Sequence, residues 1–254
     1  MPLLGWKNGA LVFSRAQPFL SACGSGAGSG FFRQYEYEEE VYLSLDGTAT
    51  VYVNASVPAL IALRGFALDP SPNATVDREA VGRLFTSPGT HLSGRVTTSR
   101  RSTRRFVHVK LLVDDIRQLG EAAPFAWSHY AFSRDGDLYR YEQVVGLPAG
   151  KDVGSVGWSG REIVAFRLHL PSRIQYHNSG RDVARGNILI WEQTLSDRLR
   201  GAPLTLDARM DAQSILYTTL WLFGVTFLGV ALTFVLVIWW IFRRGPVSAP
   251  EATH

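Results

Sequence analysis

The 254-residue chain contains a single cysteine, Cys23, and only two methionines. One cysteine excludes a disulfide within the chain and any zinc site built from several cysteines. The part of the chain that we expect to fold has no cysteine at all, which suits an oxidising compartment.

The sequence also lacks a dense stripe of lysine and arginine with interleaved aromatic residues. Its 26 basic residues are offset by 22 acidic ones, so the formal net charge is only +4. We therefore expect no nucleic-acid partner. Basic flanks of a membrane segment account for so mild an excess.

Residues with the spacing of a catalytic or metal motif are missing too. The six histidines do not recur at the four-residue interval of a metal-binding helix, and there is no phosphate-binding loop. His108 and His169 fall on the polar faces of predicted strands, where solvated side chains are the ordinary outcome. We expect a protein that is not an enzyme, with no catalytic residues, no cofactor and no metal.

One long uncharged stretch is present, from Ile215 to Phe242. As a helix it would be about 42 Å long, which exceeds the roughly 30 Å hydrocarbon core of a bilayer. Tryptophans lie near both of its ends, as interfacial aromatic residues do. We predict a transmembrane helix over 215–242, followed by a short basic and then disordered tail over 243–254.

Both ends of the chain bear on which side of the membrane the folded domain lies. Arg243 and Arg244 favour a cytoplasmic C-terminus, but basic residues also precede the span. Leu20-Ser21-Ala22-Cys23 resembles the lipobox of bacterial lipoproteins, in which the cysteine is acylated, although the apolar stretch before it is short. We predict a leader and Gly/Ser tether over 1–31, with Cys23 as the lipidation site. The alternative is that Cys23 is an incidental thiol and that the protein is tail-anchored, with its large domain in the cytoplasm.

Alternating polar and apolar residues predict strands in the region 32–210. Tyr35–Leu45 and residues 48–55 alternate with a period of two and flank Asp46-Gly47, a favoured pair for a tight hairpin turn. Further strands are expected in hairpins over 91–113 and around Asp135-Gly136, and over 163–170 and 187–195. Short helices are expected over 58–63, over 75–85 and after Asp115.

These elements predict an α+β extracytoplasmic domain. It is an antiparallel β-sheet built from hairpins, with two or three short helices on one face, and the chain adds one C-terminal transmembrane helix. Glu36, Glu38, Glu39 and Glu40 could bind a cation, but the solvated face of an edge strand is the commoner explanation for such a cluster.

The segment from Leu168 to Trp191 resembles the closing part of LppM-type bacterial lipoprotein domains. The matching residues, in order, are Pro171, Asn178, Gly186, Asn187 and Trp191, and Ser172 stands where the family usually has glycine. The resemblance implies a lipid-binding-like α+β fold on a membrane-anchored envelope protein, with glycolipid as a ligand class. From the residues alone, structural roles are expected: proline ends a strand and tryptophan fills the core.

Five arginines surround a predicted hairpin turn: Arg95, Arg100, Arg101, Arg104 and Arg105. A solvated loop is one explanation, and contact with anionic lipid headgroups or polyanionic glycans is the other. We expect a single-pass protein of the cell membrane with a non-catalytic domain that binds lipid or glycolipid. The partners would be membrane lipid and an envelope protein, and the alternative function is that of an assembly subunit in a membrane complex.

Overall fold

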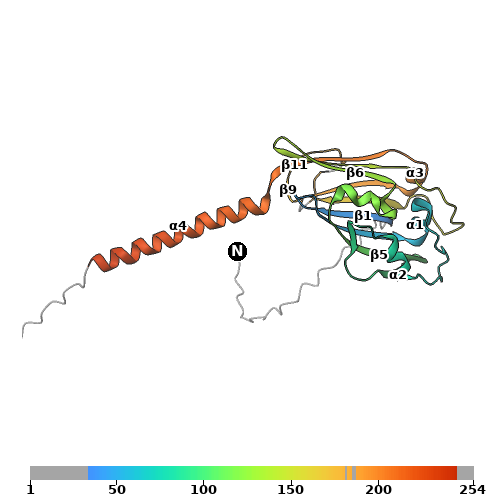
Figure 1. Cartoon of the computed structure of the whole chain (residues 1–254), viewed down its shortest axis with the longest axis horizontal. Coiled ribbons are helices and arrows are strands. Elements are labelled where there is room, and N and C mark those ends of the chain that lie inside the picture. Colours follow the sequence, from blue (N-terminus) through green and yellow to red (C-terminus); the bar gives the residue numbers. More distant parts are fainter. Residues whose placement is uncertain (1–33, 181, 185–186, 245–254) are drawn as a thin grey trace, which may run out of the picture. The chain divides into compact units, whose positions relative to one another are not determined.

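The structure, a computed structural model, describes residues 34–180, 182–184 and 187–244. Within these residues the strands are β1 (Tyr35–Leu43), β2 (Ala49–Ser56), β3 (Thr90–Leu92), β4 (Thr97–Arg101), β5 (Arg104–Val113), β6 (Ser128–Asp135), β7 (Leu138–Val145), β8 (Ile163–His169), β9 (Ser172–His177), β10 (Ile188–Thr194) and β11 (Leu204–Ser214). The helices are α1 (Val57–Arg64), α2 (Arg78–Leu84), α3 (Leu195–Leu199), α4 (Ile215–Arg243) and the 3-10 turns η1 (Ile116–Glu121) and η2 (Ala123–Phe125) (Figure 1).

The strands form two sheets that enclose one core. One sheet has the order β10-β8-β1-β2-β5-β3, with β4 also paired to β5, and the other has the order β6-β7-β11-β9. All pairings are antiparallel except that of β1 with β8. The α+β class dominated by antiparallel pairing is therefore confirmed, while the division into two sheets and strand β9 were not predicted.

The first hairpin forms as its alternation predicts. Tyr37 pairs with Ala55 and Leu43 with Ala49, and Gly47 takes a φ of 91° in the turn. However, β1 lies between β2 and β8 inside its sheet. The expectation that the glutamate cluster lies on an edge strand is therefore wrong, because both edges of β1 are paired.

Strands of both sheets run between the same two ends of the domain. β1 and β8 are parallel and finish together at Tyr42 and His169, and β9 begins three residues later beside Ser214, the last residue of β11. We call this the anchor end, because α4 follows it without a linker. The opposite end, where β1 begins, β2 finishes and the β4–β5 turn lies, is the far end.

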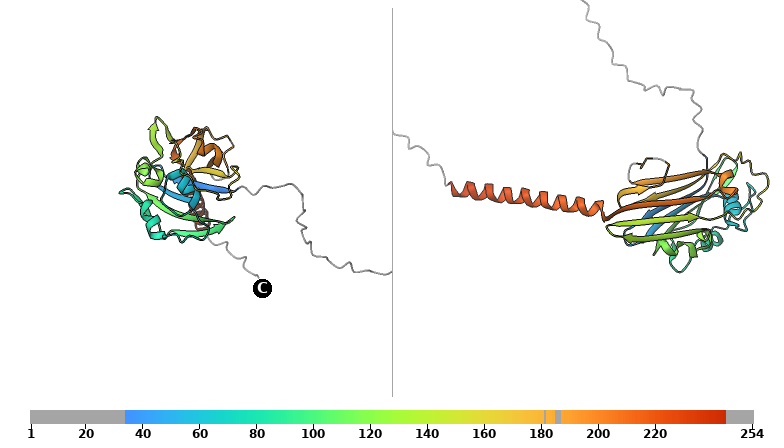
Figure 2. Two further views of the ribbon diagram at one scale, coloured as in Figure 1. Left: turned by 90° about the vertical axis from the view of Figure 1, so that its right-hand side faces the viewer. Right: turned by 90° about the horizontal axis from the view of Figure 1, so that it is seen from above.

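Helix α1 closes the core at the far end, and Figure 2 shows it beyond the strand ends in the view from above. The Ser56 side chain caps the helix by accepting a hydrogen bond from the Ala59 amide at 3.1 Å, and Pro58 occupies the first turn. Gly65 ends it with a φ of 76°. Its residues 57–63 are all buried, so it is a core helix that covers the end of the domain rather than an amphipathic surface helix.

A buried carboxylate joins the two sheets. Glu39 of β1 accepts hydrogen bonds from the Tyr37 hydroxyl at 2.8 Å, the Tyr130 hydroxyl at 2.9 Å and the Gln143 amide at 2.9 Å. Tyr130 lies on β6 and Gln143 on β7, so two of these donors come from the opposite sheet. All four residues are buried, and the carboxylate thus exchanges its water for fixed donors.

Arg64 supplies positive charge beside this carboxylate. Its guanidinium lies over the Trp127 ring and 4.4 Å from the centre of the Tyr37 ring. Burial lowers the pKa of the Arg64 guanidinium, and the nearby Tyr37 and Glu39 oppose that shift. Burial, reinforced by Glu39, raises the pKa of the Tyr130 hydroxyl well above its usual range, so this group stays a donor.

Helix α4 is apolar along its whole described length. Its segment Thr219–Arg243 has 25 residues and is long and apolar enough to cross a membrane. The described part of the chain buries none of the most apolar stretch of this segment. The Thr226 hydroxyl donates to the Leu222 carbonyl at 2.9 Å, and the Thr233 hydroxyl donates to the Gly229 carbonyl at 2.8 Å. The few polar groups are thereby satisfied within the helix, as a hydrocarbon environment requires.

We predict that Glu39→Ala lowers the free energy of unfolding by about 3–5 kcal/mol, because it removes the negative charge beside Arg64 and leaves three buried donors without their acceptor. Thermal or denaturant unfolding of the detergent-purified chain, followed by tryptophan fluorescence, measures the change. Glu121→Ala, at an exposed carboxylate, serves as the control and should stay within about 0.5 kcal/mol of the natural chain. Equal effects of the two changes would contradict a structural role for Glu39.

Candidate ligand-binding site

The arginine cluster lies at the far end, in and before the β4–β5 hairpin. Arg95, Arg100 and Arg101 are exposed, and Arg105 is half-buried. Arg104 is only 5% exposed and does not belong with the others. Its Nη2 lies 2.9 Å from Glu36 Oε1 and its Nε donates to the same oxygen at 3.0 Å. The expected contact between Arg104 and lipid headgroups is therefore wrong, because the side chain is enclosed.

Glu36 was expected to be solvated, and it is fully buried instead. Besides Arg104, it accepts hydrogen bonds from Gln34 Nε2 at 2.9 Å and from Trp158 Nε1 at 3.1 Å. The loop that carries Trp158 covers the outer face of β1 at this point. The period-two pattern placed Glu36 on the correct face, but it does not report that a distant loop covers that face.

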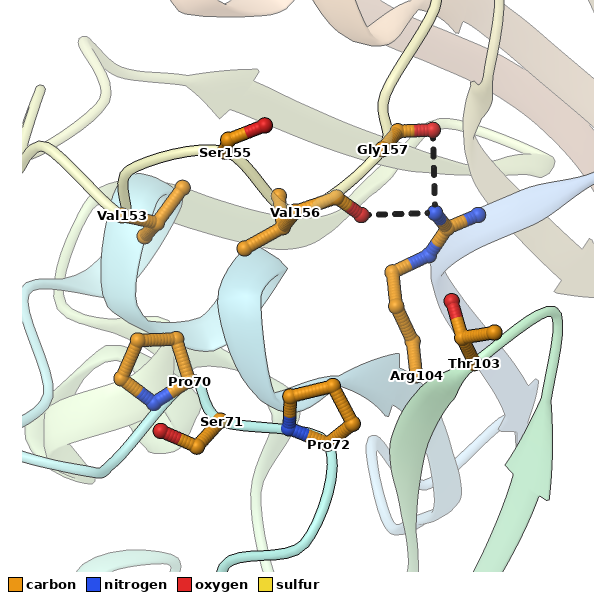
Figure 3. A pocket seen from close by; sticks show the side chains of 9 residues that line it. All are labelled: Pro70, Ser71, Pro72, Thr103, Arg104, Val153, Ser155, Val156 and Gly157. Carbon is orange, nitrogen blue, oxygen red and sulfur yellow. Dashed lines mark hydrogen bonds between the residues drawn. The ribbon is translucent and has the colours of Figure 1, made fainter.

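A pocket of about 430 Å³ lies over this ion pair (Figure 3). One wall is formed by residues 70–72 and the other by residues of the loop 153–157, while Thr103 and Arg104 complete the lining. Arg104 Nη1 donates to the carbonyls of Val156 at 3.0 Å and Gly157 at 3.2 Å, which fixes one wall. Arg100 Nη2 donates to the Pro72 carbonyl at 2.6 Å, which fixes the other.

The chemistry of this pocket is polar and close to neutral. The charge of Arg104 is compensated by Glu36, and the remaining polar side chains are the hydroxyls of Ser71, Thr103 and Ser155. None of the lining residues is a histidine, aspartate, glutamate, lysine or cysteine. The pocket thus offers hydrogen bonds and the faces of two prolines, and it contains no general base.

A smaller pocket, of about 220 Å³, lies beside it on the outer face of the same sheet. A chain of hydrogen bonds runs across its floor from β4 to β1. Ser99 Oγ lies 2.7 Å from His108 Nε2, His108 Nδ1 lies 2.9 Å from Asn54 Oδ1, and Asn54 Nδ2 donates to Glu38 Oε2 at 3.3 Å. His108 is therefore bonded on both ring nitrogens rather than simply solvated.

This chain of bonds determines the tautomer of His108. A glutamate carboxylate only accepts, so Asn54 turns its amide NH2 toward Glu38 and its carbonyl oxygen toward His108. Nδ1 of His108 then carries the proton and Nε2 accepts from the Ser99 hydroxyl. Burial lowers the pKa of the His108 imidazole, and the nearby Arg101 charge lowers it further, which keeps the ring neutral.

His169 also departs from the expectation of a solvated side chain. Its ring stacks on Tyr42 at a centroid distance of 3.8 Å, and its Nε2 lies 2.6 Å from Glu40 Oε1. No group of three or more histidine, cysteine, aspartate or glutamate side chains in the described ranges could hold a metal ion. The alternative cation site at the glutamate cluster accordingly finds no support in this geometry.

The residues that carry the family resemblance tie strands together. Trp191 Nε1 donates to Asn178 Oδ1 at 2.9 Å, and the Asn178 side chain donates in turn to the Thr205 carbonyl at 2.8 Å. Asn187, with a φ of 57°, donates from its side chain to the Ser172 carbonyl at 2.9 Å. β8 ends at His169, before Pro171. Cys23 and Gly186 lie outside the described residues.

Comparison with solved structures finds a similarity to a mycobacterial protein. The NMR structure of the folded domain of Mycobacterium tuberculosis LppM is 14% identical to this chain, with a TM-score of 0.39, over 73% of this chain and 95% of that chain. No protein-family model and no curated protein matches the sequence. The resemblance expected from residues 168–191 stays a prediction.

Sequence reasoning missed most of the residues that line the larger pocket. They come from three segments, 70–72, 103–104 and 153–157, and only Arg104 had been singled out. The prolines and glycines in two of these segments do signal loops. Nothing in the local sequence indicates that those loops meet, because their meeting depends on the pairing of Glu36 with Arg104, which lie 68 residues apart.

We predict that His108 makes the chain less stable in mild acid. A folded-state pKa below the ordinary value of 6.5 means that the unfolded chain takes up this proton first, so stability is lost as the pH falls below about 6.5. His108→Gln should reduce the difference in melting temperature between about pH 7.5 and about pH 5.5. The exposed His129→Gln control should leave that difference unchanged. A reduction of equal size in both variants would contradict the assignment.

Proposed function

We propose that the chain is a single-pass protein of the cell membrane whose α+β domain binds the polar part of a lipid or glycolipid in the far-end pocket. The observation that carries the proposal is α4, because an unburied apolar helix of this length has a large free-energy cost in water. The domain would be held at the surface and act as a binding module.

Several features of α4 support the membrane anchor. Its 25-residue apolar segment corresponds to about 37 Å of helix, enough to span the hydrocarbon core with some tilt. Trp239 and Trp240 lie near its C-terminal end, and the guanidinium of Arg243 lies 4.9 Å from the centre of the Trp239 ring. Such a pairing of aromatic and basic residues suits the interface between hydrocarbon and headgroups.

The proposed orientation places the domain outside the cytoplasm. Arg243 and Arg244 follow the apolar segment directly and favour the cytoplasmic side for the C-terminus. Acylation of Cys23 would give a second attachment to the same bilayer. The alternative orientation, a tail-anchored protein with a cytoplasmic domain, predicts an unmodified Cys23.

The larger pocket supports binding rather than turnover. Its volume of about 430 Å³ falls within the range of small-molecule sites. The neutralised floor removes a preference for anions, while the hydroxyls of Ser71, Thr103 and Ser155 suit a ligand rich in hydroxyl groups. The absence of a general base from the lining residues argues against hydrolysis at this pocket.

The anchor is tested by membrane fractionation. We predict that the full chain stays in the membrane pellet after high salt and alkaline carbonate, while a chain that ends at Ser214 and carries Cys23→Ala is released, because it lacks both the apolar helix and the acylation site. Protease added to intact cells should digest the domain, and mass analysis of the mature N-terminus should find acylated Cys23. A full chain that stays in the supernatant would overturn the proposal.

Ligand binding is tested with a variant that fills the larger pocket. We predict that lipid co-purifies with the detergent-extracted chain and that Ser155→Trp removes it, because the indole would occupy the space between the two walls. Ser133→Trp, at an exposed position on β6, is the matched control and should retain the lipid. Equal lipid content in both variants, or an empty domain in a stable complex with another membrane protein, would favour the assembly function instead.

A further inference from the structure

The β4–β5 hairpin places like charges opposite one another. Arg101 pairs with Arg104 and Arg100 pairs with Arg105, in the two pairs next to the turn. Like charges directly across a strand pair are destabilising. Glu36 compensates Arg104 alone, since within the described ranges no carboxylate forms an ion pair with Arg100, Arg101 or Arg105.

The turn of this hairpin adds backbone strain. Ser102 and Thr103 take φ values of 48° and 63°, a left-handed conformation that asparagine and glycine adopt far more readily. For a β-branched residue such as Thr103 this conformation is a real outlier. Strained backbone of this kind is found preferentially at functional sites, so the hairpin is a candidate binding surface.

The positive charge extends beyond the turn. From residue 80 to residue 113 the sequence has no aspartate or glutamate, whereas it has seven arginines and lysines, Arg83, Arg95, Arg100, Arg101, Arg104, Arg105 and Lys110. Arg100 and Arg101 donate to the carbonyls of Pro72 and Tyr35, both at 2.6 Å. These neutral acceptors hold the side chains in place and leave their charge uncompensated.

The hairpin lies at the far end of the domain. Its turn adjoins Ser56, since Phe106 pairs with Ser56, and the opposite end of β5, Val113, pairs with Ala49 at the anchor end. β5 and β11 have 10 and 11 residues, which corresponds to about 33 Å of strand. The basic surface and the start of α4 are thus separated by the full length of the sheets.

We propose that this hairpin binds an anionic glycan polymer, one that carries phosphate or carboxylate groups, on the side of the domain away from the bilayer that α4 enters. The inference rests on the proposed function for the anchoring of α4. Guanidinium groups bind both kinds of anion with paired hydrogen bonds. The cross-strand register puts Arg101 on one face of the hairpin and Arg100 and Arg105 on the other, so a chain with repeated charges engages more of them than one headgroup does.

The same geometry disfavours two other anionic partners. Headgroups that remain in the bilayer spanned by α4 lie beyond the anchor end, about 33 Å of strand from the hairpin, whereas the far-end pocket would take a lipid or glycolipid that has left that bilayer. Single-stranded nucleic acid is commonly held by exposed aromatic side chains on which its bases stack. The aromatic residue of the hairpin, Phe106, is buried, and the Arg101 guanidinium covers it at 4.5 Å from its ring centre.

The test uses the full chain in nanodiscs of phosphatidylcholine with dextran sulfate as the probe and neutral dextran as the reference. We expect salt-sensitive binding of dextran sulfate alone. The triple change Arg100→Gln, Arg101→Gln and Arg105→Gln should weaken it at least about tenfold, because three charged donors are lost. The matched change Arg117→Gln, Arg134→Gln and Arg173→Gln, at the anchor end, should weaken it by less than about threefold. Equal losses would overturn the proposal.

A second arm distinguishes the source of the anion. Nanodiscs with phosphatidylserine should bind dextran sulfate as tightly as neutral ones, because the far end lies several Debye lengths from the lipid surface. Competition by phosphatidylserine that disappears in the hairpin triple variant would mean that the hairpin contacts its own bilayer, which overturns this inference but leaves the anchor intact. Failure of the chain to insert into nanodiscs would instead contradict the proposed function.

A third measurement distinguishes a loss of binding from a loss of folding. Because Arg100 and Arg101 also hold neighbouring loops, the melting temperature of the triple variant is compared with that of the natural chain. The single change Arg105→Gln, at a half-buried position in the hairpin that makes neither of those bonds, leaves those loops untouched and should still weaken dextran sulfate binding measurably. An unchanged affinity for Arg105→Gln, together with an unfolded triple variant, would reject the hairpin as the binding surface.

Discussion

A carboxylate sealed between two sheets constrains the whole domain. Glu39 loses its water, so the donors that replace it must be held in position from both sides: Tyr37 on its own strand, and Tyr130 and Gln143 on the facing sheet. An apolar interface tolerates small shifts of one sheet over the other, whereas three directed hydrogen bonds tolerate very little. Glu39 therefore restricts how far one sheet can shift over the other, and Arg64, the last residue of α1, provides charge of the opposite sign nearby.

The elements that the sequence predicted well are those in which the local signal and the tertiary environment agree. The β1–β2 hairpin needs only alternation and Asp46-Gly47, and α4 needs only uninterrupted apolar residues. The glutamates of β1 are the opposite case, since alternation assigns their faces but burial depends on partners far along the chain. Strand β9 was missed for a related reason: residues 172–177 are largely polar and half of them are exposed, and they form a strand because they pair with the edge of β11.

The candidate site shows the same limit more sharply. Arginine density around residue 100 was visible from the sequence, but the separate environments of Arg100, Arg101 and Arg104 were not. Arg104 differs from Arg100 because Glu36 and the loop around Trp158 enclose it. Residues that build the pocket thus look identical, in sequence, to residues that face solvent. Glu36 compensates the charge of Arg104, whereas Arg100 and Arg101 bond to neutral carbonyls and keep their charge.

The junction between β11 and α4 gives the domain a mechanical property. β11 is an interior strand, hydrogen-bonded to β7 on one side and to β9 on the other. It pairs with β7 up to Asp211, and with β9 again at Ser214 after an irregular stretch. Tension transmitted through α4 is therefore applied along the axis of a strand and loads many ladder bonds in shear at once, rather than peeling them one by one. A pulling force on the helix is thereby shared between two neighbouring strands.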